Sequence, residues 1–517
     1  MKYILGARFK LFLLFFTFGT GLTFTIGWMT QFHALSNDYW NILYYGRNMT
    51  LSQPESLYNG FYPFGYAFLI GQMPFTYVLP LSYLLNALLS GLFIASVSTL
   101  LAYTDSIPAT LVAFYSSIAA PFVFQNANTL SPDIGAAAFT AFAIYLLCQN
   151  WFKKEKKELT DSQLILAGVS LGLSFLWRTH AAVSIIAILA GYVLLTGIRP
   201  LRPHILLAVS LAGVAGLQVI INLISGHGPL ETAQAFNLYK FFYGVDWTYS
   251  PTPEDIESFS LWKTIAEDPA HAFGLYKPFF LYFISHVWAA LPAFLLSPRG
   301  RFARFSFFSL IFIILYAIPI SLSDSARSPV ILMSVYLPSI SILLAVLIDM
   351  TKQHITSIRW IEWAVAVLFI GLGFQTFYGW AVYDIGITRA AIAERKVLSV
   401  IEHTLRANGM TSSSEIFSDR YDFYTPNTMP YHGRGIEKWS VDWFWGMKDD
   451  YPLLPNDSWD AFSTACKEQG IRFLVLGPNS HYRGDIFPPI YNKEVDIEAL
   501  GLRFIGQRGN MRLYELK

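Results

Sequence analysis

Charge is what the first three quarters of this 517-residue chain lack. Between Glu55 and Asp105 there are 49 consecutive residues without Asp, Glu, Lys or Arg. Further charge-free runs are 11–37, 106–132, 134–152, 162–177, 179–198, 203–230, 278–298, 305–323, 328–348 and 363–383. Backbone groups inside a bilayer find no water, so repeated apolar runs of about 20 residues predict helices that cross the hydrocarbon core. A wholly soluble fold is excluded, and a multi-spanning membrane protein is predicted.

The chain also has few cysteines and almost no net charge. The two cysteines, Cys148 and Cys466, are far apart in sequence, which excludes a disulfide framework and a cysteine-based zinc site. The formal net charge is +1, so no nucleic-acid partner is expected. The basic N-terminus and first apolar run are of signal-peptide type, but no small-residue cleavage site follows. We expect a retained first span.

Composition divides the chain into two predicted domains. Of the 36 basic and 35 acidic residues, 34 fall in 384–517, where the charged fraction is that of a soluble domain. Helical periodicity over 387–407, a buried strand at 471–477 and a hairpin over 502–516 predict a small α/β domain there. Residues 1–383 form the predicted transmembrane domain.

Lysine and arginine predict the topology, because cytoplasmic loops carry the basic residues. We expect about eleven spans, at 11–29, 81–103, 107–124, 133–150, 163–177, 181–198, 205–224, 278–297, 305–322, 330–349 and 361–383. With a cytoplasmic N-terminus, fourteen basic residues lie inside and six outside. The stretch 64–80 is then not a crossing but a re-entrant or surface piece. Two long outer loops, 30–80 and 225–277, and the C-terminal domain lie on the extracytoplasmic face.

Asp38 lies in the first outer loop, where Ser36 or Asn37 caps a predicted helix. One interpretation is that Asp38 only favours the positive N-terminus of that helix. The other is that its carboxylate is a general base held just above the membrane. The local sequence leaves both open.

Asp133 is the second acid predicted at this membrane level. It follows Ser131, a good N-cap, and Pro132, which suits the first helical position, so capping alone explains it. Alternatively, Asp38 and Asp133 together share a metal or polarise one hydroxyl. A divalent cation is therefore the one cofactor that the pattern suggests.

Basic side chains are predicted at the same face. Arg178 and His180 lie at an outer turn between spans, and Arg327 lies at the outer end of another hairpin. Such residues often extend their charge to the interface without further function. Guanidinium groups are also suited to binding phosphate. His286 lies within a span, where internal hydrogen bonding is the first explanation and a site role the second.

Several short patterns occur together in one order. An acid in a long first outer loop is followed by YPFGYAFLI at 62–70 and by an acid at the outer start of a later span. The segment from Gly168 to Arg178 reads G-x-x-x-G-L-x-F-L-x-R, and a soluble domain ends the chain. The chain resembles the GT-C superfamily of integral-membrane glycosyltransferases, particularly bacterial members related to aminoarabinose and protein O-mannosyl transferases.

This resemblance implies transfer of a sugar from a polyprenyl-phosphate donor at the extracytoplasmic face of a bacterial inner membrane. By position, Asp38 matches the catalytic acid of the family's first outer loop. Asp133 is similar to the family's second acidic position, and Arg178 is similar to the basic residue near the carrier phosphate. His180 and Arg327 are further candidates for binding that phosphate. Tyr39 follows Asp38 where the family often has a second acid.

The expected reaction is a single displacement that inverts the anomeric carbon, with a glycolipid, polysaccharide or protein as acceptor. An alternative is a transporter or flippase of a lipid-linked saccharide. A membrane scaffold whose tail binds a partner is a third possibility.

Overall fold

The chain folds into two compact units. The computed structural model describes residues 2–30, 37–58, 62–74, 77–152, 158–229, 234–244, 258–322, 329–355, 360–412, 415–419, 454–455, 458–478 and 486–517. Unit 1 consists of Met1–Trp28, Ile42–Gly244 and Asp255–Gly386. Unit 2 consists of Met29–Asn41, Val245–Glu254 and Ile387–Lys517.

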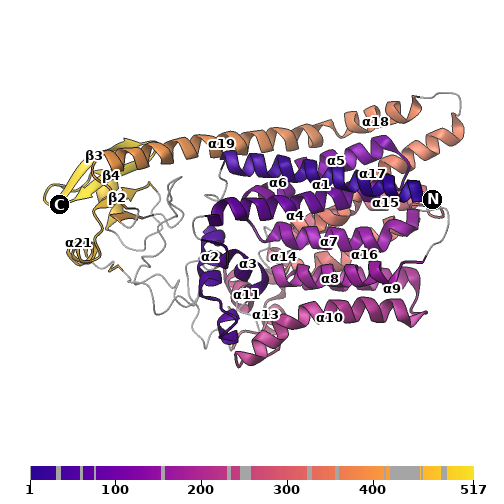
Figure 1. Ribbon diagram of the computed structural model, residues 1–517, viewed down its shortest axis with the longest axis horizontal. Coiled ribbons are helices and arrows are strands. Elements are labelled where there is room, and N and C mark those ends of the chain that lie inside the picture. The colour runs from indigo at the N-terminus through magenta and orange to yellow at the C-terminus, as the bar shows by residue number, and fades with distance from the viewer. Residues whose placement is uncertain are drawn as a thin grey trace. The chain divides into compact units, whose positions relative to one another are not determined.

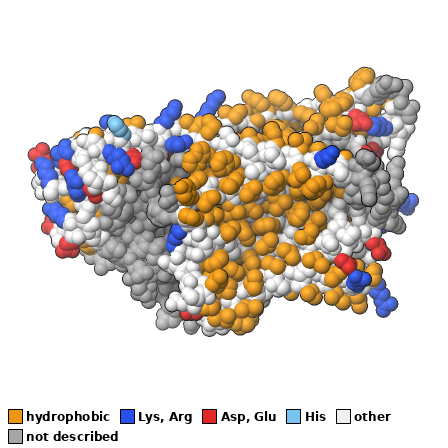
Figure 2. All heavy atoms as spheres, viewed as in Figure 1, with side chains coloured by type: hydrophobic (Ala, Val, Ile, Leu, Met, Phe, Trp, Pro, Cys, Tyr) orange, Lys and Arg blue, Asp and Glu red, His pale blue; other side chains and the backbone are white. Residues whose placement is uncertain are grey.

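Unit 1 is a bundle of apolar helices. Its unbroken long helices are α1 (Lys2–Thr30), α4 (Val78–Ala102), α7 (Asp133–Cys148), α8 (Asp161–Trp177), α9 (Ala181–Thr196), α10 (Leu201–Ile224), α16 (Ala303–Ile320) and α17 (Pro329–His354). Helices α4, α7, α8 and α10 lie side by side (Figure 1). Hydrophobic side chains cover much of the face of unit 1 seen in Figure 2, as expected for a surface that meets lipid.

The predicted fold class is confirmed, and among the described residues a helix or a bent pair of helices lies at each of the eleven predicted spans, although not all of these helices have the length of a full span. Among the described residues, six helices are long and apolar enough to cross a membrane, or nine if each of three bent pairs is one span. The predicted spans at 163–177 and 181–198 correspond to α8 and α9, which have 17 and 16 residues. At 1.5 Å per residue such helices reach about 25 Å, less than a typical hydrocarbon core of about 30 Å.

Three predicted straight spans are bent pairs of helices. Residues 107–124 form α5 (Ile107–Ala119) and α6 (Pro121–Asn128), which meet at 51°. Ala120 before Pro121 has an extended backbone, with ψ of 122°, because the proline ring disfavours a helical residue before it. The other bent pairs are α14 (Pro269–Ser285) with α15 (Val287–Leu296), at 43°, and α18 (Ile361–Leu372) with α19 (Phe374–Ala407), at 68°.

The span predicted to begin at residue 278 starts earlier, at Pro269. The Asp268 side chain accepts a hydrogen bond from the His271 backbone N–H at 3.0 Å and so caps α14. Pro278, which the charge-free run placed at the start, lies inside this helix. A polar cap outside the apolar run therefore set the true beginning of the helix.

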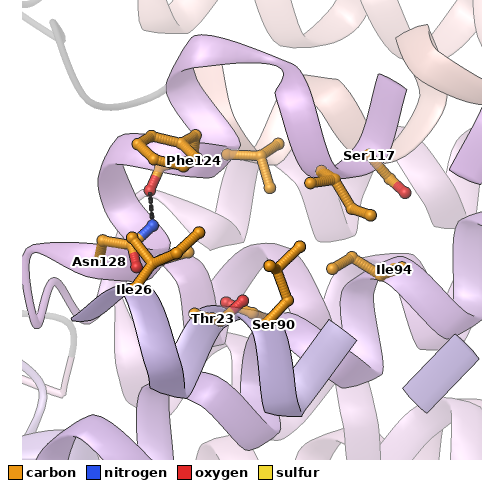
Figure 3. A pocket seen from close by; sticks show the side chains of 11 residues that line it. Thr23, Ile26, Ser90, Ile94, Ser117, Phe124 and Asn128 are labelled. Carbon is orange, nitrogen blue, oxygen red and sulfur yellow. Dashed lines mark hydrogen bonds between the residues drawn. The ribbon is translucent and has the colours of Figure 1, made fainter. Parts of the chain in front are cut away.

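A small cavity lies where α5 bends into α6, between these helices, α1 and α4 (Figure 3). Its volume of about 10 Å³ has room for one water molecule. Among the residues that line it, the buried Ser90 Oγ and Asn128 Oδ1 have no hydrogen-bond partner in the described part of the chain. The Asn128 amide donates to the Phe124 carbonyl at 2.8 Å, which fixes the last turn of α6.

In the described part of 64–80, a short helix, α3 (Phe64–Gly71), precedes α4, which begins at Val78. Eight residues reach about 12 Å, so α3 cannot cross a bilayer. It packs against α2 (Asn37–Asn48) at two glycines. A Cβ on Gly71 would lie 2.0 Å from the Gly46 carbonyl oxygen, and one on Gly46 would lie 1.9 Å from that of Ala67. The two backbones are in direct contact.

Unit 2 contains a four-stranded sheet in the order β1-β2-β4-β3. The strands are β1 (Ile416–Ser418), β2 (Phe473–Leu476), β3 (Leu502–Arg508) and β4 (Met511–Leu516). β1 is parallel to β2, and the remaining pairs are antiparallel. The predicted strand at 471–477 and hairpin over 502–516 are confirmed as β2 and β3–β4. The periodic stretch 387–407 is the last part of α19.

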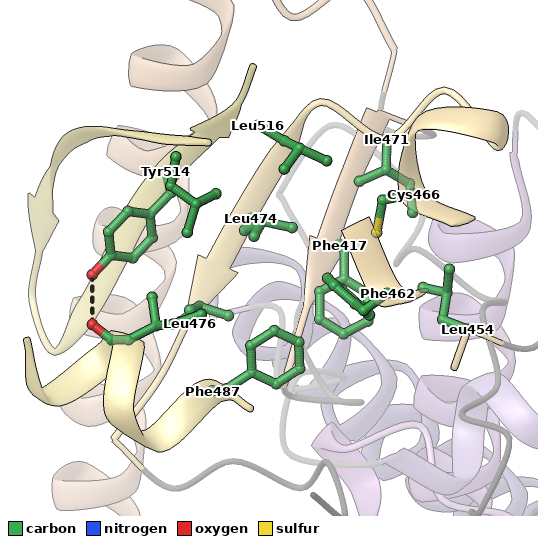
Figure 4. Packing of buried hydrophobic residues seen from close by; sticks show 12 residues of the cluster. Phe417, Leu454, Phe462, Cys466, Ile471, Leu474, Leu476, Phe487, Tyr514 and Leu516 are labelled. Atoms are coloured by element: carbon green, nitrogen blue, oxygen red, sulfur yellow. Dashed lines mark hydrogen bonds between the residues drawn. The ribbon is translucent and has the colours of Figure 1, made fainter. Parts of the chain in front are cut away.

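One face of this sheet carries a core that includes Phe417, Phe462, Phe487 and Tyr514 (Figure 4). Phe462 belongs to α21 (Trp459–Glu468), whose N-cap is Ser458, and Phe487 begins α22 (Phe487–Asn492). The Tyr514 hydroxyl donates to the Ile490 carbonyl at 3.2 Å, so the buried phenol is satisfied.

The glycine contact between α2 and α3 supports a first prediction. Gly71→Ala places a methyl group against the Gly46 backbone, so the free energy of unfolding should fall by about 3 kcal/mol, the upper range for overpacking. The measurement is unfolding of the detergent-solubilised protein. Gly213→Ala in α10 is the matched control, since its new Cβ meets nothing within 4 Å. Equal stability of the two variants would contradict the close approach.

Candidate active site

The loop between α6 and α7 is held by side chains from two other helices. Tyr66 of α3 donates its hydroxyl to the Leu130 carbonyl at 2.9 Å. Asn86 of α4 donates its amide to the Ser131 carbonyl at 3.2 Å. Leu130 has a positive φ of 55°, a conformation that non-glycine residues adopt only when their surroundings enforce it. These contacts fix the backbone just before Asp133.

The start of α7 differs by one residue from the expectation. Pro132, not Ser131, is the N-cap, and Asp133 is the first helical residue. The Ser131 hydroxyl accepts from the Asp133 backbone N–H at 3.2 Å and donates to Asp133 Oδ2 at 2.6 Å. Ser131 therefore orients the carboxylate as well as the end of the helix.

Asp133 and Arg178 form a buried bidentate ion pair. Arg178 Nε donates to Asp133 Oδ1 at 2.7 Å, and Nη2 donates to Oδ2 at 2.8 Å. Asp133 is completely buried and Arg178 is 8% exposed. Both carboxylate oxygens are thus used, a geometry that makes a strong charge-assisted contact. The structure brings together two of the residues that the sequence singled out.

Helices α7 and α8 are in register at this pair because small and polar residues line their contact. The Ser174 hydroxyl donates to the Ala136 carbonyl at 2.9 Å. A Cβ on Gly135 would lie 2.2 Å from the Trp177 ring, so only glycine allows that indole to pack on α7. Trp177 immediately precedes Arg178, which is the C-cap of α8. The position of Arg178 is therefore set by the contact between α7 and α8.

Tyr62 covers the guanidinium. The Arg178 Cζ atom lies 5.2 Å from the centre of the Tyr62 ring, within range of a cation–π interaction. Tyr62 is buried just before α3, and burial raises the pKa of its phenol. Gly65, three residues later, packs on α8, where a Cβ would be 2.6 Å from the Leu176 carbonyl oxygen. The YPFG segment thus contacts α8 immediately before Arg178.

His180 stands beside the pair. Its Nε2 atom lies 3.8 Å from Asp133 Oδ1 and is buried, with no hydrogen-bond partner among the described residues. Burial lowers the pKa of His180 to about 4; Asp133 opposes this shift and Arg178 adds to it, and the imidazole is neutral at physiological pH. For Arg178, burial lowers the pKa but the Asp133 carboxylate raises it, and the net shift is upward. Arg178 is the cation of the site.

Of the remaining candidates, the structure describes the side chain of His286 alone. Asp38 lies in the first turn of α2, and its side chain is outside the described part of the chain. Arg327 also lies outside the described residues. His286 separates α14 from α15, and its Nδ1 atom lies 3.0 Å from the Tyr282 carbonyl. That internal bond agrees with the first explanation given for His286.

A metal site does not follow from the described residues. Over those ranges no three His, Cys, Asp or Glu side chains gather as metal ligands. Both oxygens of Asp133 accept hydrogen bonds from Arg178 or Ser131, so in this arrangement the carboxylate neutralises a guanidinium.

Sequence reasoning did not assign roles to Tyr62, Tyr66 or Asn86. Tyr62 and Tyr66 belong to the YPFGY pattern, which was noted without a physical role. Asn86 is the single amide side chain of the predicted span 81–103, and an uncharged polar side chain in such a span is a signal that could have found it.

Fold and site together define a polytopic helical membrane protein with a buried Asp–Arg pair at the ends of its helices. No protein-family model and no curated protein sequence matches the chain. Among solved structures, it is similar to ArnT from Cupriavidus metallidurans bound to undecaprenyl phosphate, with 12% identity over 96% of this chain and 97% of that one, at a TM-score of 0.47.

Two archaeal structures are also similar to it. One is the Archaeoglobus fulgidus oligosaccharyltransferase in complex with Zn and sulfate, with 15% identity over 85% of this chain and 63% of that one, at a TM-score of 0.43. The other is AglB from the same organism with an inhibitory peptide and a dolichol-phosphate, with 14% identity over 92% and 70%, at a TM-score of 0.40.

The ion pair generates the next prediction. Asp133→Asn leaves the Arg178 charge buried without a counter-charge, so the free energy of unfolding should fall by about 3–5 kcal/mol. Asp161→Asn is the matched control, because Asp161 pairs with Arg202 on an exposed surface, where a pair contributes at most about 1 kcal/mol. Unfolding in mixed micelles measures both. Similar small losses in the two variants would contradict a buried pair.

Proposed function

We propose that this protein is a glycosyltransferase that moves a sugar from a polyprenyl-phosphate carrier to an acceptor hydroxyl at the extracytoplasmic face of the membrane. The observation that carries the proposal is the buried Arg178–Asp133 pair at the ends of α8 and α7. The sequence patterns around it, from YPFGY to the segment that ends at Arg178, support the same class of enzyme.

Arg178 has the chemistry that the leaving group requires. When the bond from the anomeric carbon to the phosphate oxygen breaks, its electron pair stays on the phosphate, and negative charge develops there. A preorganised guanidinium stabilises that charge without moving. Arg178 has five N–H groups; Asp133 engages two of them and Tyr62 is a further hydrogen-bond partner, so at least two donors remain for a phosphate.

Asp133 acts in this proposal through Arg178. Its carboxylate cancels the net charge of the pair, so phosphate binding relies on directed N–H donors rather than on excess positive charge. His180, neutral and with an unpartnered Nε2, is a further group for the same phosphate. Arg327 keeps the role that the sequence suggested for it, as an additional phosphate ligand.

Asp38 is the proposed general base. It takes the proton of the acceptor hydroxyl as that oxygen attacks the anomeric carbon, while the carrier phosphate leaves from the opposite face. One such displacement inverts the configuration. The carrier tail stays in the bilayer, which explains why the site lies at the ends of membrane helices.

Arg178→Lys tests the phosphate role while keeping the charge. A lysine cannot make the bidentate contact, and the loss of one charge-assisted hydrogen bond should raise the apparent KM for the donor about tenfold or more. Arg202→Lys, in the exposed pair, is the control for the same exchange. The measurement is release of polyprenyl phosphate by the purified protein. An unchanged KM in a folded Arg178→Lys protein would remove Arg178 from the donor site.

Asp38→Asn tests the base. Transfer should fall by a factor of about 10² or more, because general-base catalysis contributes at least that much. Glu55→Gln, another acid of the first outer loop, is the matched control and should retain activity. Full transfer in Asp38→Asn would contradict the assignment. Movement of the carrier-linked sugar across vesicle membranes without any release of polyprenyl phosphate would favour a flippase instead.

A further inference from the structure

Helix α10 has two buried amides on an otherwise lipid-exposed surface. Only 17% of an apolar stretch of 18 residues in α10 is buried. The exposed side chains include Leu217, Ile220, Leu223 and Ile224. Gln218 and Asn222, one turn apart, are 8% and 3% exposed. Polar side chains inside an apolar span are costly and mark a function or an interhelical contact.

Gln218 bonds to the segment that carries Tyr62. Its Oε1 atom accepts the backbone N–H of Phe64 at 3.0 Å. Phe64 is the first residue of α3, and the N-cap, Pro63, provides no side-chain hydrogen bond. The first N–H groups of a helix have no partner within it, so an outside acceptor is needed. Gln218 is that acceptor, and the N–H that it binds belongs to Phe64, two residues after Tyr62.

Asn222 fixes the orientation of the Gln218 amide. Gln218 Nε2 donates to Asn222 Oδ1 at 2.9 Å, so the Gln218 oxygen must point the other way, toward Phe64. Asn222 Nδ2 in turn faces the carbonyls of Gly228 and Pro229 at 3.5 and 3.4 Å. The two amides are therefore one directed chain of hydrogen bonds.

The same helix is locked to the helix that carries Arg178. A Cβ on Gly168 would lie 2.5 Å from the Leu207 carbonyl oxygen, and one on Gly172 would lie 2.5 Å from Val214 Cβ. The G-x-x-x-G pattern of α8 thus brings the backbones of α8 and α10 together. Because Arg178 caps the end of α8, α10 has a fixed position relative to both Arg178 and the Phe64 N–H.

We propose that Gln218 is a positioning residue of the active site, which holds Tyr62 against the Arg178 guanidinium through the Phe64 backbone. The assignment rests on the proposed function for its catalytic meaning, because Arg178 is there the ligand of the donor phosphate. Asn222 orients Gln218, and the glycines of α8 set the register between the helices. The competing explanation is that the amides only stabilise the bundle.

Three variants separate positioning from stability. Gln218→Met keeps the size and removes the acceptor, whereas Gln218→Glu keeps an oxygen for the Phe64 N–H. Gln149→Met is the matched control, since Gln149 is also a buried amide that accepts a hydrogen bond, from the Tyr103 hydroxyl at 2.7 Å. Each full-length protein is examined by hydrogen–deuterium exchange of residues 62–70 and by donor and acceptor KM.

The expected result is specific to Gln218→Met. Residues 62–70 should exchange faster, and the donor KM should rise about fivefold, the effect of losing one neutral hydrogen bond, with the acceptor KM unchanged. Gln218→Glu in its neutral form, which this buried setting favours, accepts from the Phe64 N–H and donates its O–H to Asn222, so it should keep both properties of the wild type. Gln149→Met should lower stability without changing either. Unchanged exchange of 62–70 in Gln218→Met, or an equal KM rise in Gln149→Met, would overturn the proposal.

Failure of the proposed function gives a different result. A wild-type protein that releases no polyprenyl phosphate with any donor contradicts glycosyl transfer and with it the catalytic meaning of Gln218. The exchange data then decide separately whether Gln218 holds the Tyr62 segment.

Discussion

A carboxylate and a guanidinium that leave water each lose several kcal/mol of hydration, and only good mutual geometry offsets that loss. Asp133 and Arg178 meet this condition with two parallel hydrogen bonds of 2.7 and 2.8 Å. The pair connects the start of α7 to the end of α8, and it requires both helix ends to stay in register. Many of the surrounding contacts hold the start of α7 and the end of α8 in this relative position.

The supports act on backbone atoms rather than through a large apolar core. Tyr66 and Asn86 bond to carbonyls of the loop before Asp133, and Gln218 bonds to the N–H at the start of α3. Glycines allow the close approaches, at Gly135 against Trp177 and at Gly65 against Leu176. In a membrane, where apolar burial between helices adds little, such polar and small-residue contacts specify position.

Much of this architecture could be predicted from the sequence. Charge-free runs located the apolar helices, and the sheet of the C-terminal unit followed from alternating patterns and a Gly-Asn turn. The kinks could not be placed, because the break at Ala120 depends on Pro121 in its tertiary setting and that at His286 on a local carbonyl contact. The start of α14 was missed because its cap, Asp268, lies outside the apolar run.

The site was predicted in composition but not in arrangement. Asp133, Arg178 and His180 were each predicted at the outer face, yet nothing in one sequence states that Asp133 and Arg178 bond to each other. A pairing between residues 45 positions apart depends on helix register. Tyr62 and Gln218 were missed for a related reason. The Tyr62 ring contacts the Arg178 guanidinium, and Gln218 accepts a hydrogen bond from the Phe64 backbone N–H, and neither interaction has a sequence motif.

The central claim is that Arg178, held by Asp133, is the group that meets the carrier phosphate. A structure of the protein in lipid nanodiscs with bound polyprenyl phosphate tests it most directly. The account predicts a phosphate oxygen about 3 Å from a guanidinium nitrogen of Arg178, with the bonds to Asp133 retained. A phosphate bound elsewhere, with Arg178 still enclosed by Asp133 and Tyr62, would contradict it.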